Sequence, residues 1–397
     1  MNILVICREL PYPLNAGYKI RTFNLIKGLS RDHAISLICY GDQKYDCAGI
    51  RQYCKTLKII PPQKISRFKQ APNIIKNMLS GQPFSVKYVK STAMKAAINE
   101  IIQSTRFDLI HFDDPYIVSN FDLCNENRIK KTITFHDIDS MKYMRMFKIE
   151  SGIYKKILLL FDLMMLKRWE KEITNKADLS IVTSAIDLQS IRQQVTDAKV
   201  SIVPNGVDID SYKFRRKNNS GNTIVFVGAM DYMPNHDAAL YFYRQILPII
   251  ISINSDVKFI IVGRNPNQEL QALADDPRVF VAGNVDDVTP YYEKSVVAVV
   301  PLRAGGGTRL KILEAMAVGC PVVSTSIGSE GLGVTHSKNI MIADTPENFA
   351  KYTVELMKNE AQREEQSNLA RHFVENFYSW ERIAGTMSKT YRDIMMN

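Results

Sequence analysis

Short apolar runs, rich in Val and Ile, alternate with stretches of helical periodicity along the whole chain, and this alternation limits the possible folds most. Continuous apolar strands between helices are typical of parallel sheets that are covered on both faces. In the first half the expected strands are 2–7, 34–40, 57–60, 109–112, 132–135, 179–183 and 201–203. In the second half they are 223–228, 258–263, 279–283, 296–302, 321–325 and 339–342. Two such series predict an α/β fold of two doubly wound, Rossmann-like domains.

The boundary between the two series is a turn cluster, Pro204 to Asp208, followed by a polar stretch without periodicity that ends near residue 222. The chain has 397 residues, which is long enough for two domains. We therefore predict an N-terminal domain over 1–205 and a C-terminal domain over 206–376. The remaining segment, 377–397, is expected to form a helix that returns to the N-terminal domain.

The net charge of +10 is concentrated in the first half of the chain. Residues 1–205 hold 31 Lys and Arg against 19 Asp and Glu, whereas the rest of the chain holds 20 against 22. This excess indicates either an acidic partner or a well-solvated surface. Nucleic acid is not expected, because no helix-turn-helix, zinc-finger or RNP-type motif accompanies the charge.

Cysteine usage and hydropathy favour a cytoplasmic protein. The six cysteines are dispersed, without a C-x-x-C pair or a neighbouring His cluster, which argues against a structural zinc site and a disulfide framework. The longest apolar run, 157–166, is interrupted by Asp162 and is shorter than the ~20 residues that a bilayer span needs. No basic stretch precedes the apolar run 3–7 and no cleavage site follows it, so a secretory signal is not expected.

The sharpest motif is a glycine loop, Gly305 to Gly307, between an apolar strand and a helix expected from about Thr308 to Val318. Glycines let the backbone approach a ligand closely, and the helix N-terminus offers unpaired N–H groups. Arg309 and Lys311 add positive charge to the first turn, where cations oppose the helix dipole unless an anion is present. The motif therefore predicts a phosphate-binding site.

Glu314 stands out in the same helix because its neighbours are apolar, and a carboxylate in such surroundings needs partners. Helical side chains lean toward the N-terminus, so Glu314 is expected to point back toward the glycine loop. Two explanations remain open. The carboxylate could accept hydrogen bonds from the two hydroxyls of a ribose, or it could pair locally with Lys311, three residues earlier.

The stretch 301–325 resembles the donor-binding signature of family 4 glycosyltransferases with the GT-B fold, and the likeness extends along most of the chain. The run from Gly305 to Pro321 is its most specific part. Supporting motifs are Pro11–Gly17, Phe135–Ser140, Val203–Asp208, Phe226–Asn235 and Val262–Pro266. Within the family, the sequence is similar to sugar transferases associated with bacterial surface polysaccharide assembly.

This resemblance implies two Rossmann-like domains facing a cleft, with a nucleotide-diphosphate sugar bound mainly by the second domain and an acceptor bound mainly by the first. It implies transfer with retention of configuration, without a metal and without a cofactor beyond the donor substrate. The acceptor would be a glycan or a lipid-linked molecule. The residues expected to bind the donor are Gly17, Gly306, Gly307, Thr308, Arg309, Lys311 and Glu314.

Two departures from the family pattern bear on the donor site. The family motif has two glutamates, Glu-x7-Glu, and here Gly306 occupies the first position while Glu314 occupies the second. The cationic residues usual after the first strand of the second domain correspond to Met230 and Asn235, so positive charge for the diphosphate has to come from Arg309 and Lys311. Arg264 and Arg303 are weaker candidates.

His136 and Asp137 are the catalytic candidates, because they directly follow the expected strand 132–135. Ligands bind at the carboxyl ends of strands in open α/β sheets, and the pKa of a His suits proton transfer. The alternative is a passive His beside an N-capping Asp139. Asp113 and Asp114 form a second pair at a strand end, which fits either a loop cap or an acceptor contact.

Two basic stretches, 62–95 and 141–168, also contain Met, Phe and Leu, which indicates either a solvated face or a surface that binds anionic membrane. The sequence therefore predicts a cytoplasmic transferase that could work peripherally on the inner face of the cell membrane. A nucleotide-sugar epimerase and a degenerate nucleotide-sugar-binding protein remain alternatives. A nicotinamide dehydrogenase is disfavoured, because no G-x-G-x-x-G follows either opening strand.

Overall fold

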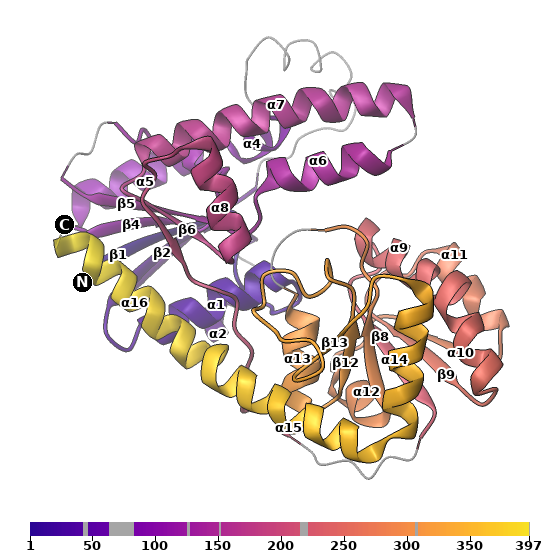
Figure 1. The fold of residues 1–397 in the computed structure, drawn as a ribbon. Coiled ribbons are helices and arrows are strands. Elements are labelled where there is room, and N and C mark those ends of the chain that lie inside the picture. The colour runs from indigo at the N-terminus through magenta and orange to yellow at the C-terminus, as the bar shows by residue number, and fades with distance from the viewer. Residues whose placement is uncertain are drawn as a thin grey trace. The chain divides into compact units, whose positions relative to one another are not determined.

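The computed structural model describes residues 1–42, 47–62, 83–124, 128–150, 152–214, 221–305 and 309–396. The chain forms two compact units: unit 1 comprises Met1–Asn205 with Trp380–Asn397, and unit 2 comprises Gly206–Ser379. Each unit is a parallel sheet with helices packed on it (Figure 1). The expectation of two doubly wound α/β domains is confirmed.

The sheet of unit 1 has seven parallel strands in the order β3-β2-β1-β4-β5-β6-β7. The strands are β1 (Asn2–Cys7), β2 (Ala34–Tyr40), β3 (Thr56–Ile60), β4 (Leu109–Phe112), β5 (Lys130–Phe135), β6 (Leu179–Val182) and β7 (Val200–Ile202). Strand β1 pairs with β2 on one side and with β4 on the other, so Ile3 lies between Ile35 and Leu109. The strand order reverses between β1 and β4, and this switch point is where open α/β sheets place their ligands.

Helices cover both faces of this sheet, which explains why its strands are apolar throughout. The helices are α1 (Gly17–Leu29), α2 (Ala48–Arg51), α4 (Phe84–Val89), α5 (Thr92–Ser104), η2 (Ile117–Asn120), α6 (Asp139–Ile149), α7 (Ile153–Lys176), α8 (Ala185–Gln194) and α16 (Trp380–Met396). The last of these, α16, packs on α1 in unit 1 although it follows unit 2 in the chain (Figure 1).

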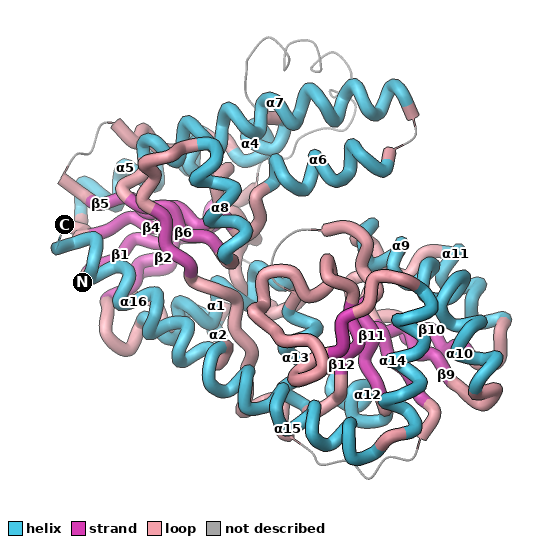
Figure 2. The backbone as a smooth tube through the Cα atoms, in the orientation of Figure 1, coloured by secondary structure: helices cyan, strands magenta, loops and turns pink. Residues whose placement is uncertain are grey.

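The sheet of unit 2 has six parallel strands in the order β10-β9-β8-β11-β12-β13. Figure 2 shows strands of this sheet in magenta with cyan helices around them. They are β8 (Thr223–Val227), β9 (Lys258–Val262), β10 (Val279–Ala282), β11 (Val297–Val300), β12 (Val322–Ser324) and β13 (Met341–Ile342). The helices are α9 (Met233–Tyr241), η3 (Phe242–Ile246), α10 (Leu247–Ile253), α11 (Gln268–Gln271), η4 (Ala272–Asp275), α12 (Thr289–Lys294), α13 (Leu310–Val318), α14 (Pro346–Lys358) and α15 (Glu360–Phe377). The switch point of this sheet lies between β8 and β11.

Two helix boundaries differ from expectation. Helix α13 begins at Leu310 rather than Thr308, with Arg309 at its N-cap in an extended conformation. The returning helix begins at Trp380 rather than 377, because the backbone N–H of Val207 bonds to the carbonyl of Tyr378 and Val207 bridges Ser379, which keeps these residues in unit 2. Among the described residues, no helix is both long and apolar enough to cross a membrane.

Candidate active site

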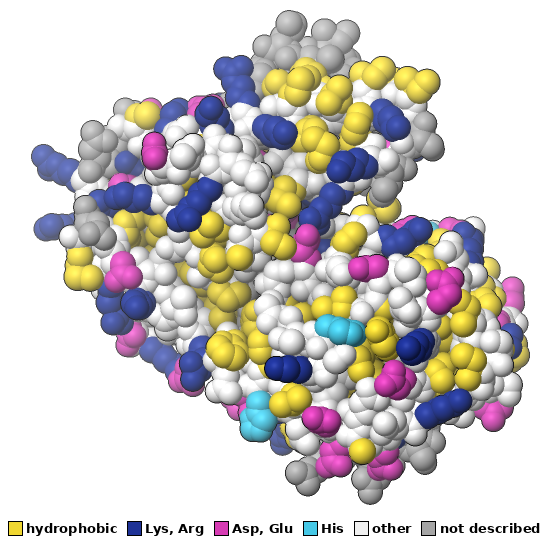
Figure 3. Space-filling model, in the orientation of Figure 1, with side chains coloured by type: hydrophobic (Ala, Val, Ile, Leu, Met, Phe, Trp, Pro, Cys, Tyr) yellow, Lys and Arg dark blue, Asp and Glu magenta, His cyan; other side chains and the backbone are white. Residues whose placement is uncertain are grey.

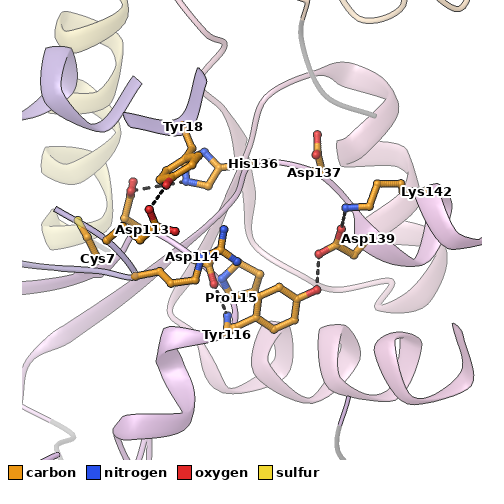
Figure 4. Close-up of a pocket in the computed structure, with 12 residues that line it drawn as sticks. Cys7, Tyr18, Asp113, Asp114, Pro115, Tyr116, His136, Asp137, Asp139 and Lys142 are labelled. Carbon is orange, nitrogen blue, oxygen red and sulfur yellow. Dashed lines mark hydrogen bonds and ion pairs between the residues drawn. The ribbon is translucent and has the colours of Figure 1, made fainter. Parts of the chain in front are cut away.

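A cavity of about 170 Å³ opens at the carboxyl ends of β1, β4 and β5 in unit 1 (Figure 4). This edge contains the topological switch point of the sheet, so three strand ends bring polar side chains together although they lie far apart in the sequence. The lining residues are Cys7 at the end of β1, Arg8 and Glu9 after it, Asp113 to Tyr116 after β4, His136, Asp137 and Asp139 after β5, Tyr18 from α1 and Lys142 from α6.

Asp113 is the centre of the cavity's hydrogen-bonding group. Its Oδ2 lies 3.5 Å from His136 Nε2 and accepts a hydrogen bond from the Thr22 hydroxyl, and its Oδ1 lies 3.7 Å from His111 Nε2. Burial alone would raise the pKa of Asp113, but the attraction of His136 and the hydrogen bonds from both histidines hold that pKa well below its usual range. Asp113 is therefore a buried carboxylate that stays ionised.

The two histidines that face Asp113 differ in their access to the cavity. The His111 side chain is 3% exposed, its Nδ1 lies 2.9 Å from the Thr132 hydroxyl, and burial lowers its pKa, so it is a neutral support. The His136 side chain is 21% exposed and lines the cavity. A His oriented by a carboxylate can donate a hydrogen bond or transfer a proton, so His136 is the residue of this group that can reach a ligand.

The other acidic residues of the cavity have distinct surroundings. Asp137 lines the cavity and lies apart from the Asp113 group in Figure 4. Asp139 is not the N-cap of α6: that position is Ile138, and the Asp139 carboxylate accepts hydrogen bonds from the Tyr116 hydroxyl and Lys142. The capping interpretation is wrong because strand β4 brings Tyr116 within reach of the first turn of α6.

Several cavity residues were not found from the sequence. Arg8 lies 3.4 Å from Asp114, and burial raises the pKa of Asp114 although Arg8 acts against it. Tyr18 donates a hydrogen bond to Glu9, and Gly17, the first residue of α1, precedes it in the chain. The sequence signal for Arg8 and Glu9 is their place directly after β1, and that for Tyr18 is its place beside Gly17 at the start of α1.

In unit 2 the described residues of the predicted donor site are Arg309, at the N-cap of α13, and Lys311 and Glu314, within that helix. Gly306, Gly307 and Thr308 lie outside the described residues. Gly305 has φ +127°, and a Cβ there would lie 2.9 Å from Arg309 Nη2, so the Arg309 guanidinium lies against this end of the loop. Arg309 is buried.

Lys311 extends from α13 to the carboxyl end of β8. Its Nζ donates a 2.7 Å hydrogen bond to Asn235 Oδ1 and lies 4.5 Å from the centre of the Phe226 ring. Burial, and to a lesser extent the charge of Arg309, lower the pKa of Lys311 to about 7, with Glu314 acting in the opposite direction. The Lys311 amino group thus lies beside Asn235, at the strand end where the sequence itself has no basic residue.

Glu314 does not form the local ion pair with Lys311, which turns to Asn235 instead. The hydroxyls of Tyr212 and Tyr292 act on its carboxyl group and favour the ionised form, and the Tyr292 hydroxyl donates a 3.1 Å hydrogen bond to the backbone carbonyl of Lys311. Burial raises the pKa of Glu314 to about 7, although Lys311 and the two hydroxyls oppose this shift. Glu314 is therefore a buried carboxyl group whose pKa lies near neutral pH, one turn after the start of α13.

The two weaker cation candidates already have acidic partners. Arg303 makes a bidentate pair with Asp237 through bonds of 3.0 and 2.5 Å and stacks over Tyr241 at 4.6 Å. Arg264 lies 3.6 Å from Asp231. Of the described basic residues that the sequence singled out in unit 2, Arg309 and Lys311 remain the candidates for an anion.

Comparison with known proteins defines the class. Residues 17–211 match the protein family described as "Glycosyltransferase Family 4". Residues 221–359 match the family described as "Glycosyl transferases group 1". The two matches include Asp113, His136 and the α13 cluster, whereas strand β1 and the cavity residues that follow it precede the first match. The chain belongs to the family 4 glycosyltransferases, and its fold is GT-B.

Individual relatives are distant. An "uncharacterized 44.6 kDa protein in cps region" of Klebsiella pneumoniae is 24% identical over 401 residues, covering 98% of this chain and 99% of that protein. A phosphatidyl-myo-inositol mannosyltransferase of Mycolicibacterium smegmatis is 24% identical over 205 residues, covering 48% of this chain and 51% of that enzyme. A TarM variant of S. aureus, solved with fondaparinux, alpha-GlcNAc-glycerol and UDP, has a TM-score of 0.72 at 13% identity and full coverage of both chains.

Proposed function

We propose that this glycosyltransferase moves a sugar from a nucleotide-diphosphate sugar to a glycan or lipid-linked acceptor, with retention of configuration and without a metal. The observation that carries the proposal is the position of Lys311, whose amino group reaches the carboxyl end of β8 while Glu314 lies one turn after the start of α13. A cation that would bind phosphate and a carboxylate that would bind ribose, both on one helix, match the diphosphate and the ribose of a nucleoside diphosphate.

The donor would lie on unit 2. Its diphosphate would contact Lys311, Arg309 and the backbone N–H groups of Gly306, Gly307 and Thr308, and its ribose would hydrogen-bond to Glu314. These groups would stabilise the negative charge that develops on the departing diphosphate, because preorganised donors act strongly where water is excluded. Gly17 would let the donor approach the start of α1 closely.

His136 and Asp137 would act on the reacting side, with Asp113 holding the His136 ring. The acceptor would enter the cavity of unit 1, which offers Arg8, Tyr116 and Lys142 as further polar contacts. Relatives point to acceptors of this kind, since one is named for a phosphatidyl-inositol substrate and another binds a glycerol glycoside together with UDP. The excess positive charge of unit 1 supports the proposal that the enzyme acts at the inner face of an anionic cell membrane.

The test is to incubate the protein with a panel of nucleotide-diphosphate sugars and oligosaccharide or lipid-linked acceptors, and to follow nucleoside diphosphate release and acceptor mass. We expect release that depends on the acceptor, and calorimetric binding of a nucleoside diphosphate that Lys311→Ala weakens about tenfold or more, because hydrogen bonds between charged groups contribute ~1.5–3 kcal/mol. Lys338→Ala, at an exposed position of unit 2, is the matched control.

Three results would overturn parts of the proposal. Conversion of the donor sugar without an acceptor would indicate an epimerase. Tight binding without turnover would indicate a degenerate sugar-nucleotide-binding protein. Equal affinity of wild type and Lys311→Ala for every nucleoside diphosphate would remove the α13 cluster from the donor site.

A further inference from the structure

Helix α7 exposes a row of large apolar side chains. Ile153, Tyr154, Ile157, Leu160 and Met164 are 78, 69, 60, 45 and 50% exposed. Isolated apolar residues on a surface need no explanation, but a contiguous patch marks a binding surface. No other described helix exposes more than two side chains of this kind.

The spacing places four of these residues on one face. Ile153, Ile157, Leu160 and Met164 follow one another at intervals of four, three and four, which is the period of a helical stripe. The stripe extends about 16 Å along the helix axis at 1.5 Å per residue. We call these four residues the α7 stripe.

The opposite face of α7 is already used by the core of unit 1. Leu166, Trp169 and Ile173 are buried, and the Trp169 indole N–H donates a 3.1 Å hydrogen bond to the carbonyl of Pro115. Glu170 accepts hydrogen bonds from the backbone and hydroxyl groups of Ser140 at the start of α6. The second half of α7 is therefore anchored to the sheet, and the α7 stripe is not needed to hold the helix in place.

Positive charge borders the α7 stripe. At ~100° per residue, Lys156, Lys167 and Arg168 flank the stripe, whereas Lys155 lies on the opposite side of the helix. The one acidic residue of the described span 153–168 is Asp162, which is half-buried. Figure 3 shows hydrophobic side chains over α7 with Lys and Arg side chains among them.

This charge pattern selects the partner. A helix with an apolar face bordered by Lys and Arg lies in the interface of an anionic bilayer, with its apolar side chains among the upper acyl chains and its cations at the head groups. A second copy packed stripe to stripe would bring the same cations against one another, which is unfavourable.

We propose that the α7 stripe inserts into the surface of an anionic lipid bilayer. Membrane insertion does not itself depend on the proposed function. Only the purpose of the insertion, the delivery of a lipid-linked acceptor, rests on that function. Helices α6 and α7 pack against each other, and Asp139 and Lys142 in the first turn of α6 line the Asp113 cavity. The same helical pair thus carries the α7 stripe and part of the cavity wall.

Insertion predicts a different salt response from binding by charge alone. Electrostatic attraction to a charged surface fades within a Debye length, so added salt abolishes binding that depends only on Lys and Arg. Buried apolar side chains are not screened. We therefore expect added salt to weaken the binding of wild type without removing it.

The first experiment is co-sedimentation with phosphatidylcholine vesicles, with and without phosphatidylglycerol, at low and high salt. We expect wild type to bind the anionic vesicles, the double variant Ile157→Ser/Leu160→Ser to bind at least tenfold more weakly, and Lys156→Gln/Lys167→Gln to lose the preference for phosphatidylglycerol. The control is Ile253→Ser/Phe280→Ser, which removes two similarly exposed apolar side chains from unit 2.

The second experiment tests insertion directly. The two tryptophans of the chain, Trp169 and Trp380, are both buried, so Leu160→Trp introduces a reporter at an exposed position. Its fluorescence should shift to shorter wavelength on anionic vesicles and be quenched by lipids brominated in the acyl chain, whereas Phe280→Trp should show neither change.

The proposal is overturned if wild type stays in the supernatant with anionic vesicles at low salt, if the stripe variant binds as wild type does, or if Leu160→Trp shows no vesicle response. Light scattering that shows a dimer converted to a monomer by Ile157→Ser/Leu160→Ser would assign the stripe to a second copy. Nucleoside diphosphate calorimetry on the same proteins separates the two proposals: retained affinity without vesicle binding leaves the transferase intact and rejects only the membrane surface.

Discussion

At the residue scale, Lys311 makes donor binding sensitive to pH. Its pKa is lowered to about 7 by burial, with Arg309 adding to the shift and Glu314 opposing it. A bound diphosphate favours the charged ammonium, so binding raises this pKa and takes up protons above pH 7. We expect nucleoside diphosphate affinity to fall up to about tenfold per pH unit above 7, since one pKa unit corresponds to ~1.4 kcal/mol.

The measurement is calorimetry between pH 6 and 9 in two buffers of different ionisation enthalpy, which counts the protons taken up. Lys311→Arg is the matched variant, because Arg keeps its charge throughout this range and should remove the pH dependence. Glu314→Gln should leave it in place. Proton uptake that persists in Lys311→Arg would assign the titration to another group.

A second residue-scale prediction concerns Gly228, at the end of β8. A Cβ there would lie 2.7 Å from Lys311 Nζ and 2.9 Å from the Asn235 side chain. Because these neighbours are side-chain ends that can move, Gly228→Ala should displace Lys311 and weaken nucleoside diphosphate binding several-fold without unfolding unit 2. Gly283→Ala, which meets nothing within 4 Å, is the control and should bind as wild type does.

His136 should matter for turnover rather than for donor binding, because it belongs to unit 1 and faces the cavity. His136→Ala is expected to lower kcat by ~100-fold, a typical loss for a proton-transfer or positioned hydrogen-bonding group, with nucleoside diphosphate affinity unchanged. Asp113→Asn should lower kcat less, because it removes the charge but keeps a side chain of the same size. Wild-type turnover in His136→Ala would make the residue structural, and the exposed His372→Ala serves as the control.

At the element scale, the contact between α1 and α16 depends on a glycine. A Cβ on Gly28 would lie 2.3 Å from the Cβ of Ala384, so the two helices touch where neither has room for a larger residue. Gly28→Ala should reduce the free energy of unfolding by ~1–3 kcal/mol, the usual cost of overpacking. In α16, Gly385→Ala has open space and should be neutral or stabilising by ~0.5–1 kcal/mol. Urea unfolding compares the two, and equal effects would contradict this account.

At the scale of the whole molecule, α16 completes the core of unit 1 although unit 2 precedes it in the chain. Trp380, Ile383, Met387, Tyr391 and Ile394 pack in the same cluster as β1 and β2. Deletion of 380–397 should therefore expose unit 1 and spare unit 2. Hydrogen exchange should rise in peptides from β1, β2 and α1 and stay unchanged in peptides from β8 and β11; equal loss of protection in both units would reject this.

The sequence by itself determined the two parallel sheets, because apolar runs without polar alternation are stable only when both faces of a strand are covered. It also placed His136 at a strand end and Arg309, Lys311 and Glu314 beside a glycine loop, since these positions depend on local order along the chain. The tertiary structure decided the partners. Lys311 bonds to Asn235, and His136 meets Asp113, only because parallel strands that are distant in sequence end at one edge. The tertiary structure also decided that the α7 stripe is exposed. The sequence of α7 is apolar on several faces, so it does not show which of them the sheet will cover.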